Sequence, residues 1–182
     1  NLTWTLKNMD VRNNWNGDFF VTVYRNAENE NGEIVFSVYE DYEVKPSGDI
    51  RVNYEIIKSD WVPSLPKAGV QMKVSDELVT TEWVGYAQET YKDRQACGFV
   101  GHYEAPTDDL FHHYVRPQAA GNRMQTRYVS LLNDKHERML SAKMEGMNCQ
   151  FSIYPYEDKN IEQAKHTNEL NKAGYYILNI DY

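Results

Sequence analysis

Residues 49–57 read DIRVNYEII, and apolar and polar side chains alternate along this stretch. Successive side chains of an extended strand point to opposite sides, so one side of this strand would be apolar. That side carries Ile50, Val52, Tyr54 and Ile56, whereas Arg51, Asn53 and Glu55 lie on the other. An antiparallel strand with one face in water has this pattern. The stretch therefore predicts a β-rich fold.

Similar strands are predicted on both sides of this stretch. Residues 18–25 and 32–44 are rich in aromatic and β-branched residues. The Asn31-Gly32 step between them is typical of a hairpin turn, because both residue types tolerate positive φ. Further strands are predicted at 70–74, 78–86, 111–115, 126–132, 150–153 and 175–181. Residues 93–109 look irregular.

Two other segments interrupt the strand pattern. Residues 157–165, EDKNIEQAK, favour a short helix because most of them are good helix formers. Residues 61–66, WVPSLP, contain two prolines that cannot donate to a β-ladder, which predicts a loop or sheet crossover rather than a domain linker. We therefore expect residues 1–182 to form a single all-β domain, an antiparallel β-sandwich with one short helix near 157–165.

The composition is that of one soluble globular domain. The 182 residues are 41% hydrophobic and 25% charged, and the aromatic fraction of 13% suits half-buried β-sheets. A formal net charge of -8 argues against nucleic acid as a partner, because phosphate binding needs a basic surface. No apolar run approaches the ~20 residues that cross a bilayer, so no membrane partner is expected.

Neither the cysteines nor the histidines have metal-site spacing. Cys97 and Cys149 each lack a second cysteine nearby, which favours two buried free thiols over a zinc site and leaves a disulfide between them open. The adjacent His112 and His113 would point to opposite faces of a strand, so they could not hold one ion together. No metal site is predicted.

Three carboxylates lie close together in the sequence, namely Glu104, Asp108 and Asp109. A glycosidase needs two carboxyls ~5–9.5 Å apart, with the pKa of one raised by burial. Nothing in the surrounding stretch, EAPTDDLF, indicates burial, and a solvated loop is the better interpretation. No catalytic residue is predicted.

Three arginines lie within residues 114–132, YVRPQAAGNRMQTRYVSLL, and these are Arg116, Arg123 and Arg127. Guanidinium groups hold carboxylates and carbonyls with fixed geometry. We expect these arginines to pin loops near Asp93 and Asp108. The alternative is that they line a ligand cleft.

Four segments form an ordered series of motifs. Residues 83–94, WVGYAQETYKDR, are similar to W-x-G-x-G-P-x-E-x-Y-x-D-R, and residues 114–123, YVRPQAAGNR, are similar to Y-x-x-P-Q-E-x-G-N-R. Residues 151–170 are similar to F-S-x-x-x-Y…H-x-x-E-L, and residues 178–181 match L-N-I-D. Over residues 83–182 the chain thus resembles the C-terminal "small chain" domain, domain 5, of the β-galactosidases of glycoside hydrolase family 2.

The chain departs from this pattern at several points. The Gly-Pro of the first motif is missing, and Ala119 stands where the family usually has Glu. The R-A-P-x-D-N-D run that normally opens the domain is absent, as is the Gly-rich run that normally follows L-N-I-D. The strongly patterned strand 175–181 also stops at the end of the chain. We therefore expect a fragment of a larger multidomain enzyme that lacks both ends of the domain.

The resemblance implies a fold and a set of residues. The fold is an antiparallel β-supersandwich, similar to galactose mutarotase. The residues that match the motifs and have an implied structural role are Asp93, Arg94, Arg116, Arg123, Arg127 and His166. Some family members place a Trp in the sugar site just before L-N-I-D, and Tyr175, Tyr176 and Ile177 occupy that place here. These three are the implied substrate-binding residues.

The resemblance also implies a function. The family's catalytic glutamates, and its Mg and Na ligands, lie in a separate barrel domain, so this chain would be non-catalytic, without cofactors, and would pack against that barrel. The parent enzyme would hydrolyse terminal β-galactosides in the bacterial cytoplasm or periplasm, and a galactoside is an implied ligand. An exposed last strand would favour a homodimer. The alternative is a self-standing carbohydrate-binding or mutarotase-like module that uses exposed aromatic residues such as Trp61, Trp83, Tyr175 or Tyr176.

Overall fold

The computed structural model describes residues 2–65, 67–145 and 149–182. The chain divides into two compact units, Asn1–Leu65 and Pro66–Tyr182, and each is described by itself. The division falls within residues 61–66, which the sequence predicts to be a crossover rather than a linker; Pro66 lies outside the described residues. The single domain expected for residues 1–182 stays a prediction.

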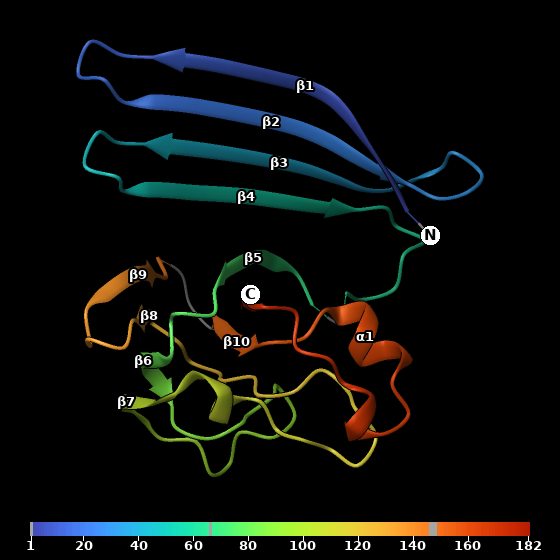
Figure 1. Ribbon diagram of the computed structural model, residues 1–182. Coiled ribbons are helices and arrows are strands. Elements are labelled where there is room, and N and C mark those ends of the chain that lie inside the picture. The colour runs from blue at the N-terminus through green and yellow to red at the C-terminus, as the bar shows by residue number, and fades with distance from the viewer. Residues whose placement is uncertain (1, 66, 146–148) are drawn as a thin grey trace. The chain divides into compact units, whose positions relative to one another are not determined.

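The first unit is a four-stranded antiparallel meander in the order β1-β2-β3-β4 (Figure 1). Its strands are β1 (Thr3–Asn13), β2 (Phe19–Glu28), β3 (Ile34–Val44) and β4 (Ile50–Lys58). Gly32 has a φ of +80° in the turn between β2 and β3, so the hairpin predicted at Asn31-Gly32 is confirmed. Strands β2, β3 and β4 are confirmed too, whereas β1 is an addition to the predicted elements.

Side chains alternate across this sheet as the sequence predicts. A row of facing residues crosses all four strands and consists of Val11, Val21, Tyr42 and Val52. On the same face, Arg25 forms an ion pair with Glu40 at 2.7 Å and lies over the Trp4 ring. Residues 49–57 thus form the predicted strand, β4, but its apolar side is not buried, because Ile50, Val52 and Tyr54 are all exposed.

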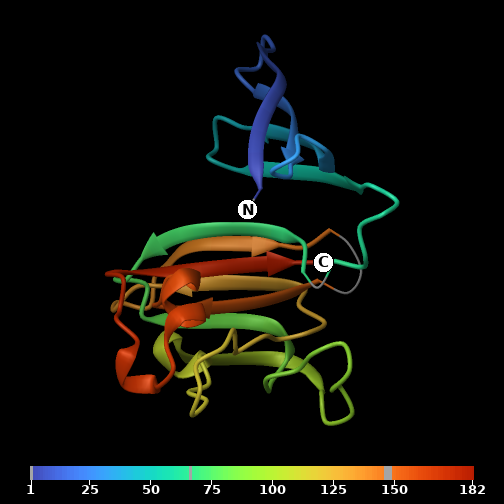
Figure 2. The same ribbon diagram turned by 90° about the vertical axis from the view of Figure 1, so that its right-hand side faces the viewer.

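Among its described residues, the second unit contains two antiparallel sheets. One has the order β10-β11-β5 and the other has the order β7-β6-β8-β9. Their strands are β5 (Gly69–Ser75), β6 (Thr80–Tyr86), β7 (Val100–Pro106), β8 (Tyr128–Leu132), β9 (Arg138–Lys143), β10 (Gln150–Tyr154) and β11 (Tyr175–Asp181). Figure 2 shows β5 in green alongside β11 in red.

A shared apolar core joins the two sheets of this unit. Trp83 and Val129 from one sheet and Phe151 and Leu178 from the other belong to one buried cluster. Burying each such side chain contributes roughly 1.5–3 kcal/mol relative to leaving it in water. The all-β sandwich predicted from the sequence is confirmed.

The helical content is low, as predicted. The helix α1 (Asp158–Gln163) lies within the expected range 157–165. Two short 3-10 turns, η1 (Thr107–Leu110) and η2 (Thr167–Glu169), are also present. The strand predicted at 111–115 is wrong, because these residues form a loop between η1 and β8.

Two strands of the second unit were not predicted. β7 lies in the segment that looked irregular, and β9 follows a charged turn. In β7, Tyr103 and Ala105 pack against the core while the intervening Glu104 is exposed. The alternation is real, but it includes only two apolar residues, and such a short pattern is hard to distinguish from a loop.

The last strand, β11, is an interior strand of its sheet. Leu178 lies opposite Ile153 of β10 on one side and opposite Met72 of β5 on the other. The expectation that the final strand presents an exposed edge is therefore wrong. The outer strands of this sheet are β10 and β5.

Candidate functional site

The first two sequence motifs meet in space through main-chain and side-chain hydrogen bonds. The amide of Thr90 donates to the carbonyl of Asn122 at 2.8 Å, and the Asn122 side-chain amide donates back to the Thr90 carbonyl at 2.8 Å. The Thr90 hydroxyl accepts the amide of Met124 at 3.0 Å. These bonds join residues 83–94 to residues 114–123. We call Glu89, Thr90, Gly121, Asn122 and Arg123 the clasp.

Glu89 is the acidic member of the clasp. Its carboxylate accepts the Gly121 amide at 3.1 Å, lies 3.4 Å from the hydroxyl of Tyr114 and accepts the hydroxyl of Tyr91. Burial, with the adjacent Glu89 charge, raises the pKa of Tyr91. Gly121 itself has a φ of +77°, and a Cβ atom there would lie 2.1 Å from the carbonyl oxygen of Leu110. The close approach to Leu110 therefore requires glycine at this position.

Arg123 is the basic member of the clasp and is only 7% exposed. Its guanidinium donates to the carbonyl of Gly121 at 2.6 Å and to that of Leu110 at 3.2 Å. Burial lowers the pKa of Arg123 to about 10, which leaves it charged at neutral pH. Within the described residues, its Nε atom has no hydrogen-bond partner. Arg123 thus holds loop carbonyls.

The predicted partners of the arginines are bound elsewhere. Asp93 forms an exposed ion pair with its neighbour Arg94 at 2.7 Å. Asp108 accepts the Lys172 ammonium at 2.6 Å and the Tyr176 hydroxyl at 3.0 Å. The expectation that the arginines of residues 114–132 pin loops through Asp93 and Asp108 is therefore corrected: Arg123 pins loops through carbonyl groups instead.

The remaining motif residues are on the surface. Arg116 and Arg127 are exposed. His166 is exposed as well, and its carbonyl accepts the amide of Glu169 at the start of η2. The structure therefore brings only Arg123, of the six predicted motif residues, into the clasp.

The three predicted substrate-binding residues lie at the start of β11. Tyr176 and Ile177 are buried, at 5% and 1% exposure. Tyr175 is half-buried; Lys73 lies over its ring at 4.4 Å, and its hydroxyl contacts both Lys73 and Glu157. A sugar contact through these residues stays a prediction, and only the Tyr175 side chain is partly open to solvent.

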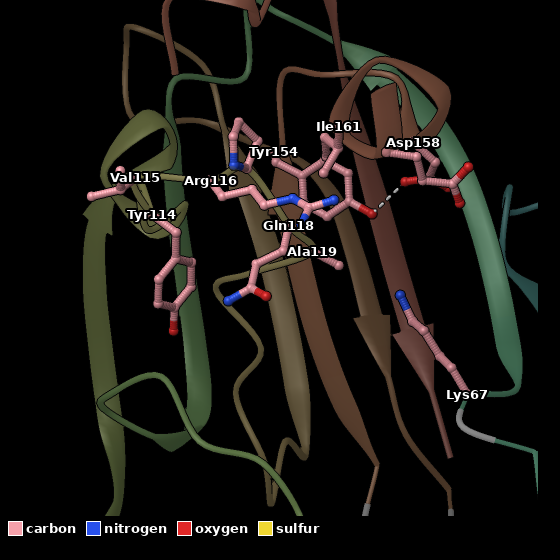
Figure 3. A pocket seen from close by; sticks show the side chains of 11 residues that line it. Lys67, Tyr114, Val115, Arg116, Gln118, Ala119, Tyr154, Asp158 and Ile161 are labelled. Atoms are coloured by element: carbon pink, nitrogen blue, oxygen red, sulfur yellow. Dashed lines mark hydrogen bonds between the residues drawn. The ribbon is translucent and has the colours of Figure 1, made fainter. Parts of the chain in front are cut away.

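A pocket of about 760 Å³ lies beside residues 114–119 (Figure 3). Residues 114–119 form one wall, and the rest is lined by Lys67, Tyr154 and three residues of α1, namely Asp158, Ile161 and Glu162. Figure 3 shows Arg116 and Gln118 reaching in from one side while Lys67 reaches in from the other. The second sequence motif therefore lines a concave surface of this unit.

Some charged groups of this pocket are already paired. Asp158 accepts the hydroxyl of Tyr154 at 2.7 Å, drawn as a dashed line in Figure 3, and the side-chain amide of Gln71 at 2.8 Å. Lys67 lies 3.0 Å from the buried carboxylate of Asp181. Burial raises the pKa of Asp181, and Lys67 only partly offsets this effect.

Other polar groups of the pocket are free. Across residues 2–65, 67–145 and 149–182, no hydrogen bond or ion pair engages the side chains of Arg116, Gln118 or Glu162. All three are exposed. They can therefore bind a ligand without first breaking an internal contact.

A buried carboxylate in β6 was missed from the sequence. Glu82 accepts two hydrogen bonds from Arg138 at 2.8 Å, one from Tyr128 at 3.1 Å, and lies 2.5 Å from His102 Nε2. Burial acts to raise the pKa of Glu82, but these donors outweigh burial and lower it. The available signal was a single Glu within the strand sequence TTEWVGY.

The possible metal ligands and the two cysteines were also located in the structure. Among the residues that the structure describes, no three His, Cys, Asp or Glu side chains are grouped so as to hold a metal ion. Cys97 is an exposed free thiol, so the expectation that it is buried is wrong. Cys149 is a free, partly buried thiol, and burial raises its pKa.

None of the described helices combines the length and apolar character that spanning a bilayer would need.

Comparison with known proteins identifies similar sequences along almost the whole chain. A family model described as "Beta galactosidase small chain" matches residues 3–182. The β-galactosidase of Streptococcus thermophilus is 27% identical over 135 residues, which are 72% of this chain and 13% of that protein. The β-galactosidase of Halalkalibacterium halodurans is 30% identical over 144 residues, which are 76% of this chain and 14% of that protein.

One further relative is a separate subunit. The "Beta-galactosidase small subunit" of Latilactobacillus sakei is 31% identical over 148 residues, which are 76% of this chain and 46% of that protein. The chain thus spans less than half the length of each of these three relatives. The match to the family model covers both compact units and both motifs of the clasp, and the chain belongs to the β-galactosidase small chain family.

Proposed function

We propose that this chain is a non-catalytic domain of a β-galactosidase and that it supports a catalytic barrel supplied by the rest of the enzyme. The clasp carries this proposal, because it uses the two family motifs to hold loops rather than to present reactive groups. The relatives in which the matched region is a minor part of a β-galactosidase agree with such a role.

Several carboxylates of the described residues have structural partners. A retaining glycosidase needs two carboxyls ~5–5.5 Å apart, one acting as a nucleophile and one as a general acid. The pocket residue Asp158 is occupied by Tyr154 and Gln71. The earlier candidates are also engaged or exposed: Glu104 lies 3.1 Å from His136, and Asp108 binds Lys172. These contacts support the proposal that catalysis lies in another domain, and the Mg and Na ions that the family resemblance implies would be held there as well.

The partner of this chain is the catalytic domain of the parent enzyme. That domain can belong to the same polypeptide or to a second subunit, and the small-subunit relative illustrates the second arrangement. A terminal β-galactoside is the substrate that we propose for the assembled enzyme. A homodimer would have to form through strands other than β11, because β11 is paired on both sides.

A measurement of hydrolysis tests the proposal. The purified 182-residue chain should not hydrolyse an aryl β-galactoside. Mixing it with a parent enzyme from which the matched region has been deleted should restore hydrolysis. Turnover by the chain alone, abolished by replacing one of its own carboxylates, would refute the non-catalytic role. Full activity of the deleted parent without the chain would refute the supporting role.

The self-standing carbohydrate module is the second candidate. Two of its four proposed aromatic residues, Trp83 and Tyr176, are buried in the core. Trp61 is 59% exposed and Tyr175 is half-buried, so these are the two remaining aromatic residues that could contact a sugar. A module that relied on Trp83 or Tyr176 is therefore disfavoured.

A further inference from the structure

We propose that the pocket between residues 114–119 and α1 binds a neutral polyhydroxyl ligand, a mono- or disaccharide. The proposal rests on the chemistry of the pocket walls and does not depend on the activity of the parent enzyme. Its volume of about 760 Å³ lies within the ~300–1,000 Å³ typical of small-molecule sites.

The charges of the pocket favour a neutral ligand. Two cationic groups, Lys67 and Arg116, line it together with two acidic groups, Asp158 and Glu162. An anionic ligand would approach both carboxylates, and a cationic ligand would approach both basic groups. A ligand without charge avoids both conflicts, because hydroxyl groups can donate to the carboxylates and accept from the cations.

The free polar groups match the two-sided hydrogen bonding of a sugar. Arg116 only donates, Glu162 in its ionised form only accepts, and Gln118 does both. Each of these side chains is exposed, and within the described residues no hydrogen bond or ion pair engages it. Hydrogen bonds that involve charged groups are stronger than neutral ones, so Arg116 and Glu162 are the main expected anchors.

Apolar groups complete the lining. Tyr114 and Ile161 also line the pocket. A sugar has C–H groups as well as hydroxyls, and an aromatic ring with a polar tip can contact both. Tyr114 is held in place because its carbonyl accepts the hydroxyl of Thr167 at 3.1 Å.

Ala119 keeps part of this space open. It lines the pocket in the same segment as Arg116, at the position where the resembling family motif has Glu. A Glu side chain there would occupy part of the volume and bring a carboxylate towards the guanidinium. Ala119→Glu is therefore the sharpest variant, because the substitution is at an exposed residue and is compatible with the family motif.

Titration of the 182-residue chain with methyl β-D-galactoside and with lactose, followed by two-dimensional NMR, tests the proposal. The expected result is saturable binding in the millimolar range, with shifts in residues 114–119 and α1. Ala119→Glu and Arg116→Gln should each weaken binding by about tenfold or more. Arg127→Gln is the matched control, because Arg127 is also an exposed arginine of the same segment but does not line the pocket. Its affinity should be unchanged.

Three results would overturn the proposal. The first is no saturable binding of either sugar by a chain whose spectrum shows it to be folded. The second is binding that survives both Ala119→Glu and Arg116→Gln. The third is a stronger response to galacturonate or galactosamine than to the neutral sugars, which would make the pocket a site for charged ligands. None of these results bears on hydrolysis by the assembled enzyme.

Discussion

The guanidinium of Arg123 lies over the indole ring of Trp83, with its Cζ atom 5.2 Å from the ring centroid. Trp83 opens the first family motif and Arg123 closes the second, and both are buried. A desolvated cation over an aromatic face is favourable by roughly 2 kcal/mol. The two motifs are thus held together by a cation–π contact as well as by the hydrogen bonds of Thr90.

Replacement of Arg123 by Met should lower the free energy of unfolding by about 2–4 kcal/mol. The change leaves the carbonyls of Leu110 and Gly121 without their donor and removes the cation from the Trp83 ring. Urea denaturation followed by circular dichroism measures this loss. Arg127→Met is the control and should stay within about 0.5 kcal/mol, because Arg127 is exposed. Equal losses in the two variants would contradict the assignment of Arg123 to the clasp.

Replacement of Gly121 by Ala should be much more costly than replacement of Gly174. Both residues have φ near +80°, and an alanine costs about 1–2 kcal/mol in this region. At Gly174 a Cβ atom would meet nothing within 4 Å, whereas at Gly121 it would lie 2.1 Å from the carbonyl oxygen of Leu110. Melting temperatures of the two alanine variants measure the difference. Similar melting temperatures would show that the loop at Gly121 adapts freely.

Replacement of Glu82 by Gln should destabilise the protein at neutral pH by about 1–3 kcal/mol, because the buried carboxylate loses its charge-assisted hydrogen bonds. The folded-state pKa of Glu82 lies below its usual 4.5. Its stabilisation is therefore present above pH 4.5 and is lost as the pH falls through the folded-state pKa. The gap between the variant and the unchanged chain should narrow from pH 7 towards pH 3 in urea denaturation. A gap that is independent of pH would contradict this role of the Glu82 charge.

Replacement of Asp181 by Asn should show the opposite dependence. Burial raises the folded-state pKa of Asp181 above its usual 3.8, so ionisation of this group costs stability as the pH rises through that raised value. The variant should gain stability relative to the unchanged chain between pH 3 and pH 7. The Lys67 ion pair limits the gain at neutral pH to about 1 kcal/mol. A loss that grows with pH would show that the ion pair outweighs burial.

Much of the fold could be predicted from the sequence. Residues 49–57 correspond to β4 because apolar and polar side chains alternate there, and residues 157–165 contain α1 because most of them are good helix formers. β7 was missed because only Tyr103 and Ala105 of that strand are apolar and face the core. β11 was expected at an edge because it is the last strand of the sequence. The partners of a strand are set by tertiary packing, however, and they cannot be read from its position in the chain.

The site was less predictable than the fold. Motif spacing placed Arg123 in a structural role but not its acceptors, because main-chain carbonyls carry no signal in the sequence. The pocket beside α1 brings Lys67 and Glu162 together with residues 114–119, although these segments are far apart in the chain. A local sequence pattern does not show which distant segments come into contact, so this pocket could not be predicted.

The interior position of β11 has a consequence for how the chain folds. Tyr175 pairs with Ser75, so the strand that pairs with β5 lies roughly a hundred residues further along the chain. Pairing of such distant strands requires closure of a long loop, and the chain loses entropy in this step before the contacts between the strands can form. Distant pairings are therefore typical of slow folding. During synthesis, β5 leaves the ribosome long before β11, so the edge of β5 that pairs with β11 stays without that partner over the interval.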